Sequence, residues 1–422
     1  MTRIAARVAW AAVLALSLAA GCTPSSPASP TPSPTPSLSE RGPITFAAPG
    51  DPTGALEADL REWNTSRPDE PVTLRELPAS ADARRDDLLG RARSHDGEYT
   101  VTAVDLVWVP QLAETGALAD LSADGLATAG LLPIARDAGT HGGVYTYPYT
   151  ADAGLLYYRK DLLDAAGLQP PTTWTELASA CATIRMTHPE MECFATPDRP
   201  GESLTVSVVE AIQGAGGQAF AADGSPTFDS ADAAAGLSWL RADSVAGFDD
   251  GTLQAAFGRG EFVFTRGWSE AWALIGAEPG ALVTRDRAGV AQLPGRDGAA
   301  PPVFGGRGLA ISTHGGNLDT ARDFVRWMAA EERQRRRFEL AGSGPAIAAL
   351  YDDASVSGSP LGAALEDAVG RARPRPAATE YAELSQAVSD DVAAWLADDS
   401  ATDAPRLLDG LQRKLEGIVA GR

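Results

Sequence analysis

The 422-residue sequence has few long apolar runs, and this scarcity excludes a multi-span membrane protein. Near the N-terminus, residues 8–20 are apolar except for Ser17, which is too short a stretch for the about 18 residues of a membrane span. Arg3 and Arg7 precede it. A basic start followed by a short apolar segment is typical of a signal peptide, which we predict over residues 1–21. The rest of the chain is therefore expected to be exported.

The sequence also lacks the short motifs of common enzyme classes. It contains no Gly-x-x-x-x-Gly-Lys-[Ser/Thr] loop, no His-Glu-x-x-His and no Gly-x-Ser-x-Gly, and its four histidines stand at no metal or triad spacing. The Gly-rich stretch 214–217 lacks the strand context of a dinucleotide site. We therefore expect no catalytic residue, no metal and no cofactor. A cell-surface glycoside hydrolase stays an alternative, because it needs only two carboxylates across a sugar.

Basic residues are too few to balance the acidic ones. The chain has 35 Lys and Arg against 56 Asp and Glu, a formal net charge of −21. Such a surface repels phosphate backbones and anionic headgroups, so we expect no nucleic-acid partner. The dense basic run at 333–337 is interpreted as the solvated end of a helix, where the helix dipole favours cations.

Cysteine is rare, and each of the three residues has a predicted role. Ala19-Ala20-Gly21-Cys22 resembles a bacterial lipobox, in which the cysteine is lipidated and becomes the mature N-terminus; an ordinary signal peptide with an incidental cysteine is the alternative. Cys181 and Cys193 remain as a pair, and outside the cell such a pair usually oxidises to a disulfide. A metal site there would need more ligands, and only His188 is near.

Residues 22–42 are predicted to form a lipidated cysteine and a Pro/Ser-rich tether. Six prolines occur between residues 23 and 39, with no aromatic or charged residue. This composition favours extended polyproline II with a reach of roughly 50 Å. We expect the protein to lie on the outer face of the cell membrane, held there by a lipid anchor at Cys22 after export.

The first part of the mature chain alternates strands and helices. Strands are predicted at 44–48, 72–77 and 101–109, with helices at 54–64 and from 111, an order that indicates an α/β domain with a mainly parallel sheet. Further strands are predicted at 144–149, 155–159, 261–265 and 309–312, and further helices at 160–166, 170–186, 203–214, 230–242, 250–259, 268–276, 319–340, 361–371, 380–397 and 405–419. The length and the absence of a second linker suggest two lobes that exchange chain more than once.

Polar and aromatic residues gather where strands end. Ligands of open α/β sheets bind beyond the carboxyl ends of strands, and sugars suit flat aromatics together with Asp and Arg. Asp105 stands inside an apolar strand, where a buried carboxylate needs partners. Trp108 and Trp272 could equally pack in a core. The set comprises Asp51, Asp105, Trp108, Tyr147, Tyr149, Asp152, Arg266, Trp268, Trp272, Arg307, Arg373 and Tyr381.

These segments resemble a known family, the extracellular solute-binding proteins of the maltose-binding type (family 1). Residues 147–162 (YPYTADAGLLYYRKDL) resemble its crossover segment, and Pro171-Thr172-Thr173-Trp174 resembles a helix start of the family. RGWSEAW at 266–272 is similar to a stretch of actinobacterial trehalose-binding lipoproteins. GRGEFVF at 258–264, GGRGLAIS at 305–312 and the helix from 321 to 342 resemble further family segments.

The resemblance implies a periplasmic-binding-protein-like type II fold, with two α/β lobes joined by crossing hinge segments. Residues 43–150 plus 310–355 would form lobe 1, and residues 151–309 plus 356–422 lobe 2. It implies a monomeric, non-enzymatic substrate-binding protein of an ABC importer, which delivers a solute to the transmembrane permease subunits. By position, the ligand contacts would be Asp51, Asp105, Tyr149, Asp152, Trp268, Gly306, Arg307 and Arg373.

Some positions depart from the family pattern. Asp152 replaces an asparagine, so an ionised group that only accepts hydrogen bonds stands where an amide could also donate. Ser269 and Glu270 follow the tryptophan in place of Pro and Tyr, and Arg307 occupies a position that is often aromatic or small. Trehalose itself is therefore not assumed. We expect a carbohydrate, a di- or oligosaccharide; a polyol, a glycerophosphodiester, a peptide or another anionic solute is the alternative.

Overall fold

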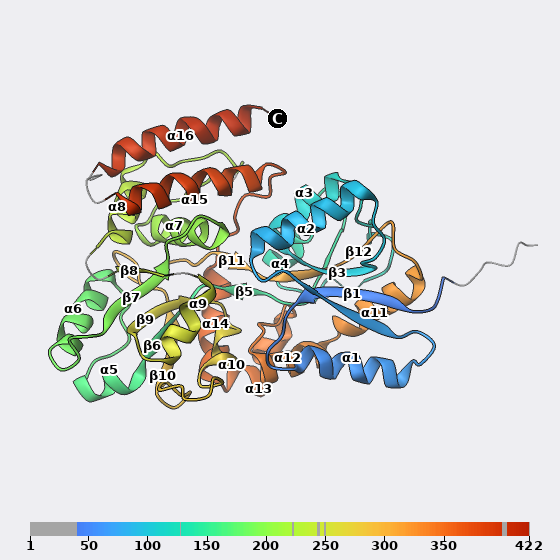
Figure 1. Ribbon diagram of the computed structural model, residues 1–422, viewed down its shortest axis with the longest axis horizontal. Coiled ribbons are helices and arrows are strands. Elements are labelled where there is room, and N and C mark those ends of the chain that lie inside the picture. The colour runs from blue at the N-terminus through green and yellow to red at the C-terminus, as the bar shows by residue number, and fades with distance from the viewer. Residues whose placement is uncertain are drawn as a thin grey trace, which may run out of the picture. The chain divides into compact units, whose positions relative to one another are not determined.

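The computed structural model describes residues 40–126, 128–221, 223–242, 245–248, 250–398 and 403–421. The chain divides into two units, residues 1–38 and 39–422, and all of the described residues belong to the second (Figure 1). The predicted signal peptide, Cys22 and nearly all of the predicted tether therefore lie outside the described residues. No helix in the described part of the chain is long and apolar enough to cross a membrane.

The first lobe is built on a five-stranded sheet of order β2-β1-β3-β12-β4. β1 pairs in parallel with β2 and β3, whereas β12 runs antiparallel to β3 and β4, so the sheet is mixed rather than mainly parallel. Its strands are β1 (Ile44–Pro49), β2 (Val72–Leu77), β3 (Val101–Asp105), β4 (Tyr147–Pro148) and β12 (Arg307–Ile311). Its helices are α1 (Ala55–Ser66), α2 (Ala81–Ser94), α3 (Val109–Glu114), α4 (Pro133–Ala138), α11 (Leu318–Met328) and α12 (Glu331–Ala341).

The core of this lobe follows from the apolar periodicity of its helices. Leu56, Leu60 and Trp63 recur at helical spacing on α1 and are buried against the sheet. The Trp63 ring meets Phe324 of α11 edge to face, with ring centroids 5.2 Å apart. Aromatic packing of this kind fixes α1 and α11 on the sheet.

The second lobe has its own five-stranded mixed sheet, of order β10-β6-β9-β7-β8. Its strands are β6 (Leu155–Arg159), β7 (Glu192–Pro197), β8 (Val245–Phe248), β9 (Phe262–Gly267) and β10 (Ala288–Gln292). Its helices are α5 (Lys160–Ala166), α6 (Trp174–Arg185), α7 (Glu202–Gly214), α8 (Ala231–Leu240), α9 (Asp250–Gly258), α10 (Ala271–Leu274), α15 (Tyr381–Ala397) and α16 (Ala404–Ala420). In Figure 1, α15 and α16 are stacked over α7, and the three share one apolar core.

A short two-stranded ribbon joins the lobes. β5 (Asp152–Ala153) leads into the second lobe and pairs antiparallel with β11 (Phe304–Gly305), which leads back. The chain crosses again through α13 (Ala354–Ser357), α14 (Pro360–Arg371) and the segment 372–378 before α15. β12 of the first sheet begins at Arg307, next to the expected lobe boundary at 310. The two lobes therefore exchange chain repeatedly, with these crossing segments as the hinge.

The disulfide expected in the second lobe is present in the structure. Cys181 on α6 is bonded to Cys193 on β7, with their Cα atoms 5.4 Å apart. α6 begins at a capping box, in which the Thr173 hydroxyl accepts from the Glu176 amide and the Glu176 carboxylate accepts from the Thr173 amide. The bridge and the cap together fix α6 on the edge of the lobe.

Four local expectations are wrong. Of the strand expected at 144–149, only Tyr147–Pro148 are in a strand, β4. The strand expected at 101–109 ends at Asp105, and a 3-10 turn η1 (Leu106–Trp108) leads into α3, whose first turn contains a proline. The helix expected at 319–340 is two helices, because Ala330 is extended (φ −60°, ψ 148°). The helix expected at 268–276 is only the single turn α10. At residues 101–109 and 319–340, apolar residues continue through a bend that hydrophobicity alone does not reveal.

The basic run on α12 was also misread, because two of its arginines are not solvated. Arg333 and Arg337 are 7% and 5% exposed, and both lie 3.4 Å from the buried carboxylate of Asp59 on α1. Arg333 also pairs with Glu62. The run therefore ties α12 to α1 through ion pairs inside the lobe.

Candidate functional site

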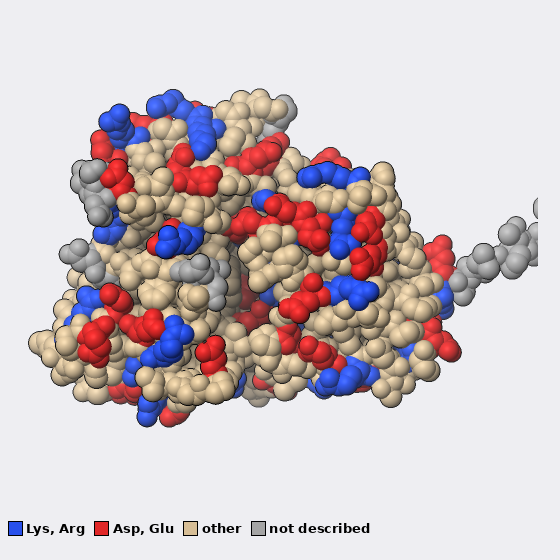
Figure 2. Space-filling view, viewed as in Figure 1, with Lys and Arg blue, Asp and Glu red and all other residues tan. Residues whose placement is uncertain are grey.

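A cavity of about 560 Å³ lies between the two lobes. The end of β3, the start of α2, the crossing segments, the end of β9 and the start of α7 line it. A smaller cavity of about 170 Å³ lies under the loop between β1 and α1. Thr150, Glu270 and Arg307 line both, so the two form one cleft. Figure 2 shows a hollow between the lobes, with acidic side chains gathered beside it over α2.

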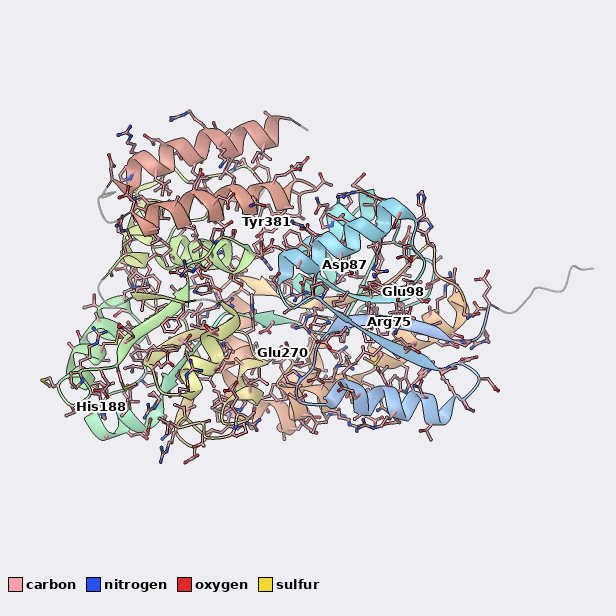
Figure 3. The ribbon with its side chains drawn as sticks, in the orientation of Figure 1. Arg75, Asp87, Glu98, His188, Glu270 and Tyr381 are labelled. Atoms are coloured by element: carbon pink, nitrogen blue, oxygen red, sulfur yellow. A yellow bond between two sulfur atoms is a disulfide. The ribbon has the colours of Figure 1, made fainter. Side chains whose placement is uncertain are left out.

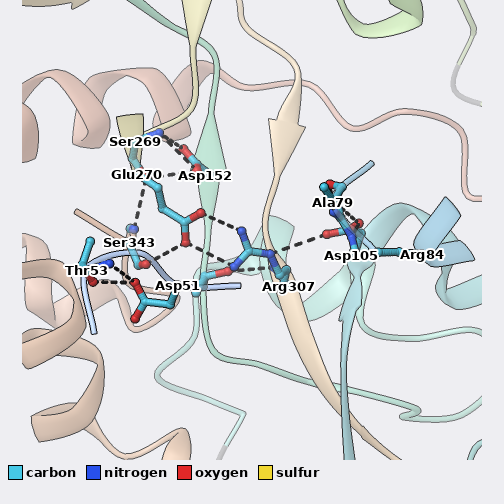
Figure 4. Close-up of polar contacts among 12 residues, drawn as sticks. Asp51, Thr53, Ala79, Arg84, Asp105, Asp152, Ser269, Glu270, Arg307 and Ser343 are labelled. Atoms are coloured by element: carbon cyan, nitrogen blue, oxygen red, sulfur yellow. Dashed lines mark hydrogen bonds and ion pairs between the residues drawn. The ribbon is translucent and has the colours of Figure 1, made fainter. Parts of the chain in front are cut away.

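Strand register brings the first pair of charges together. Asp105 is the last residue of β3, and Arg307 is its partner on β12. The Arg307 Nε atom lies 3.6 Å from Asp105 Oδ1. From the other side, Arg84 of α2 donates through Nη2 to Asp105 Oδ2 at 3.0 Å (Figure 4). The carboxylate in the apolar strand thus has the partners that a buried charge requires.

Glu270 extends this cluster to the second lobe. It follows β9 and accepts from Arg307 Nη1 at 3.2 Å and Nη2 at 2.7 Å, a bidentate pair. The Ser343 hydroxyl, after α12, donates to the same carboxylate at 2.8 Å. Burial disfavours the ionised form, but the Arg307 charge and these hydrogen bonds hold the pKa of Glu270 below its usual value. We call Arg84, Asp105, Arg307 and Glu270 the cleft cluster.

Asp152, on hinge strand β5, is held by backbone and hydroxyl donors. Its carboxylate accepts from the Ser269 amide at 3.0 Å, the Ser269 hydroxyl at 3.0 Å and the Ala153 amide at 2.8 Å. Burial, followed by the nearby Glu270 charge, raises the pKa of Asp152 to about 7. The position that departs from the family pattern is thus a carboxylate that titrates near neutral pH.

Trp268 presents an aromatic ring to the cavity. The Arg266 guanidinium carbon lies 3.7 Å from the Trp268 ring centroid, and Arg266 is held by the buried Glu210 at 3.0 and 2.9 Å. A Cβ atom on Gly305 would lie 2.7 Å from the ring, so glycine there lets the indole sit against the hinge. The ring is therefore fixed in place at the wall of the cleft.

The remaining expected residues have different surroundings. Asp51 accepts from the Thr53 amide at 2.9 Å and the Leu56 amide at 2.7 Å, and so orders the loop before α1. Tyr149 is buried beside it, and burial raises the pKa of its phenol. Gly306 has a φ of 126°, and a Cβ atom there would lie 2.4 Å from the Thr150 carbonyl oxygen. Only glycine fits this crossing of the hinge segments.

Arg373 lies apart from the other seven expected residues. It lines an adjoining cavity of about 800 Å³, which meets the cleft at Val107, Gly305 and Arg375, and it donates to the Gly217 carbonyl at 3.1 Å. Two positions further along, Arg375 does reach the cleft and pairs with Glu202 at the start of α7. The structure therefore brings seven of the expected residues together at the two cavities described first and places Arg373 in the adjoining one; the seven are Asp51, Asp105, Tyr149, Asp152, Trp268, Gly306 and Arg307.

Sequence reasoning missed Arg84, Glu202 and Arg375. Glu202 accepts from the Tyr381 hydroxyl at 2.8 Å and from Ser385 at 2.5 Å, so it joins α7 to α15 (Figure 3 labels Tyr381 and Glu270). None of the three carries a motif, and each stands among similar charged residues. Among the described residues, no group of three or more His, Cys, Asp or Glu could hold a metal ion.

A sequence model of bacterial extracellular solute-binding proteins matches residues 72–364. The chain belongs to this family. A probable ABC transporter-binding protein of Deinococcus radiodurans is 29% identical over 368 residues, which span 82% of this chain and 87% of that protein. As an ABC transporter solute-binding protein, the chain belongs to a non-enzymatic class.

Solved structures agree on the fold of this solute-binding protein. Maltose-bound MalE3 of T. maritima superposes with a TM-score of 0.82 at 25% identity, over 89% of this chain and 99% of that chain. The GacH receptor of Streptomyces glaucescens, solved unliganded and with acarbose, gives a TM-score of 0.81 at 20% identity, over 90% of this chain and 99% of that chain. The two-lobe periplasmic-binding-protein fold is therefore that of this chain.

Proposed function

We propose that this solute-binding protein captures a neutral carbohydrate, a di- or oligosaccharide, between its lobes and delivers it to an ABC permease. The observation that favours an uncharged solute is the pairing of the cleft arginines with carboxylates. Each of the five that line the cavity of about 560 Å³ lies beside a carboxylate of this chain: Arg84 by Asp105, Arg199 by Asp198, Arg266 by Glu210, Arg307 by Glu270 and Arg375 by Glu202. At Arg84, Arg266, Arg307 and Arg375, whose side chains are mostly covered, an anionic solute would have to compete with a carboxylate that is already in place. Arg199 is 74% exposed and does not contribute to this argument.

The remaining features of the cleft suit hydroxyl groups and a sugar ring. An Arg guanidinium has several N–H donors and a carboxylate has two accepting oxygens, so groups that are paired with each other can also donate to and accept from hydroxyls. Trp268 offers an apolar ring for the C–H face of a sugar. The cavity volumes of about 560 and 170 Å³ lie in the range usual for small-molecule sites.

Most solutes named for similar proteins are sugars, sugar-like compounds or polyols. A probable amino-acid ABC transporter periplasmic-binding protein of Sinorhizobium fredii, 24% identical over 223 residues, is an exception. Among the structures is a cyclic α-maltosyl-1,6-maltose binding protein from Arthrobacter globiformis, with a TM-score of 0.74. Polyols are the second candidate, because a mannitol-binding protein of Pseudomonas aeruginosa is 44% identical over 57 residues, 13% of each chain. These names support the class of solute and not one sugar.

A thermal-shift screen of the purified protein tests the proposal. We would compare mono-, di- and oligosaccharides, polyols and glycerophosphodiesters; a ligand at 100 times its dissociation constant adds about 2.7 kcal/mol of stability. Stabilisation by a sugar that is recovered unchanged would support capture. A response to polyols alone would favour the second candidate. A response to anionic solutes alone would overturn the argument from the paired arginines.

We further propose that Cys22 carries a lipid that anchors the protein to the outer face of the membrane. The lipobox-like residues 19–22 and the Pro-rich tether support this location. Cys22→Ser should move the protein from the membrane fraction to the medium. Retention of the variant in the membrane fraction would contradict a lipid anchor at this residue.

A further inference from the structure

The first turn of α7 lies at the cleft and is capped by the opposite lobe. The residue before the helix is Gly201, which has no side chain to accept from the first amide groups. The Glu202 amide instead donates to Asp82 Oδ2 at 2.9 Å. Asp82 belongs to α2 of the first lobe, whereas α7 follows β7 of the second. Figure 1 shows these two helices facing each other across the lobes.

Asp82 is presented to α7 by a well-ordered turn. The Ser80 hydroxyl accepts from the Ala83 amide at 3.2 Å and so caps α2. Arg84 donates to the Ala79 carbonyl at 2.5 Å and to Asp105 at 3.0 Å. The start of α2 is thereby fixed to the end of β3, and the Asp82 carboxylate has a defined position at the rim of the cavity.

The start of α7, which donates to Asp82, is attached to the hinge. The Glu202 side chain pairs with Arg375, and Arg375 donates to the carbonyl of Phe304 on β11 at 3.2 Å. The lack of a side chain at Gly201 lets the Asp82 carboxylate come close to the start of α7, since a Cβ atom there would lie 3.1 Å from Asp82 Oδ2. The φ of Gly201, 141°, is also unfavourable for other residues. The neighbouring Glu202 carboxylate repels Asp82, and Arg375 offsets that repulsion.

We propose that Asp82 is a positioning residue for solute capture: it latches the closed state by capping α7 across the cleft. The two partners belong to different lobes, so opening separates them and exposes both to water. The contact therefore stabilises only the closed state, and it holds part of the population closed before solute arrives. The inference rests on the solute-binding function of the family and on no particular class of solute.

Two measurements on the purified full chain, without added solute, test the latch. Amide hydrogen exchange of the segment 201–206 reports the Glu202 amide, and the small-angle scattering radius of gyration reports lobe opening. The variants are D82A and D82N, the second of which keeps an accepting oxygen. The matched control is D86A. Asp86 lies one turn further along α2 and pairs with Arg85 at 2.8 Å, and Asp82 lies 3.5 Å from the same arginine, so D86A removes a carboxylate from Arg85 but leaves the Asp82 contact with α7 in place.

We expect D82A to speed exchange of the Glu202 amide about five-fold and to raise the radius of gyration, as the loss of a charged helix cap predicts. D86A should match the wild type in both measurements, and D82N should lie between. Equal exchange in D82A and D86A would overturn the contact. Faster exchange in D82A with an unchanged radius of gyration would mean that Asp82 only caps α7 locally, and this result would also overturn the latch.

Discussion

Two clusters of arginine and carboxylate groups in this protein share their chemistry and differ in their surroundings. Between α1 and α12, Asp59 is 1% exposed at its side chain and its partners Arg333 and Arg337 are 8% and 7% exposed. In the cleft cluster, Arg307 is 23% and Glu270 is 36% exposed. The first cluster is closed to solvent within one lobe, and the second opens onto a cavity between two lobes.

The comparison shows that position in the fold, and not residue type, separates a structural ion pair from a candidate binding surface. Removing one partner from a fully buried cluster strongly destabilises the protein, because the remaining charge stays in a medium of low dielectric. A partly hydrated cluster tolerates change and can exchange hydrogen bonds with a solute. Substitutions in the first should alter stability, and substitutions in the second should alter binding.

The largest expected effect is on the buried cluster. Asp59→Ala would leave two buried guanidinium groups without this carboxylate, and we expect a loss of about 3–5 kcal/mol in the free energy of unfolding. Urea unfolding measures it. The control is Glu331→Ala, since Glu331 pairs with Arg335 at i,i+4 on the surface of the same helix and should cost less than about 0.5 kcal/mol. Similar costs for both variants would show that the buried Asp59 cluster contributes no more to stability than a surface ion pair.

A second prediction uses the pKa of Asp152, beside the cleft cluster. Burial raises this pKa from 3.8 to about 7, so between these values the folded state binds more protons than the unfolded state. Asp152 therefore lowers stability as pH rises through this window. Asp152→Asn should remove that slope and reduce the loss of stability between pH 5 and 8 by on the order of 2 kcal/mol. Urea unfolding at several pH values measures it, and parallel curves for the two proteins would contradict it.

Elements whose ends are set locally could be predicted from the sequence. The strands at 72–77 and 155–159 and the helix at 160–166, which ends at Gly167 with a φ of 67°, have the bounds that turn residues and periodicity indicate. The turn after Asp105 and the break at Ala330 depend on packing between distant segments. Apolar residues pack equally well in a strand, a 3-10 turn or a helix, so their pattern does not locate these bends.

Cleft residues at the ends of strands could be predicted from the sequence, whereas cleft residues on helices could not. Asp105, Asp152, Trp268 and Arg307 come next to strand ends or hinge strands, and the fold places such positions together. Arg84 could not be distinguished in sequence from Arg85. Their different roles arise from the orientation of α2, which turns Arg84 toward Asp105 and Arg85 toward the Trp108 ring.

The smallest expected effect is that of a substitution at Arg307, which tests whether the cleft cluster binds solute. Arg307→Lys keeps the positive charge but replaces a planar fork, which contacts Glu270 through two nitrogens, by a single ammonium. We expect the affinity for the best sugar in the thermal-shift screen to fall about five- to ten-fold, close to 1 kcal/mol, with little change in melting temperature. Isothermal titration calorimetry of both proteins measures the affinity.

The matched control is Arg259→Lys, because Arg259 pairs with Glu261 at 2.6 Å on the surface, with 53% of its side chain exposed. That exchange should alter neither affinity nor stability, since an exposed ion pair contributes little. A loss of affinity in Arg307→Lys alone would assign solute binding to the cleft cluster. If Arg307→Lys instead loses stability and keeps its affinity, the cleft cluster behaves like the Asp59 cluster. Both clusters would then stabilise the fold, and neither would bind the solute.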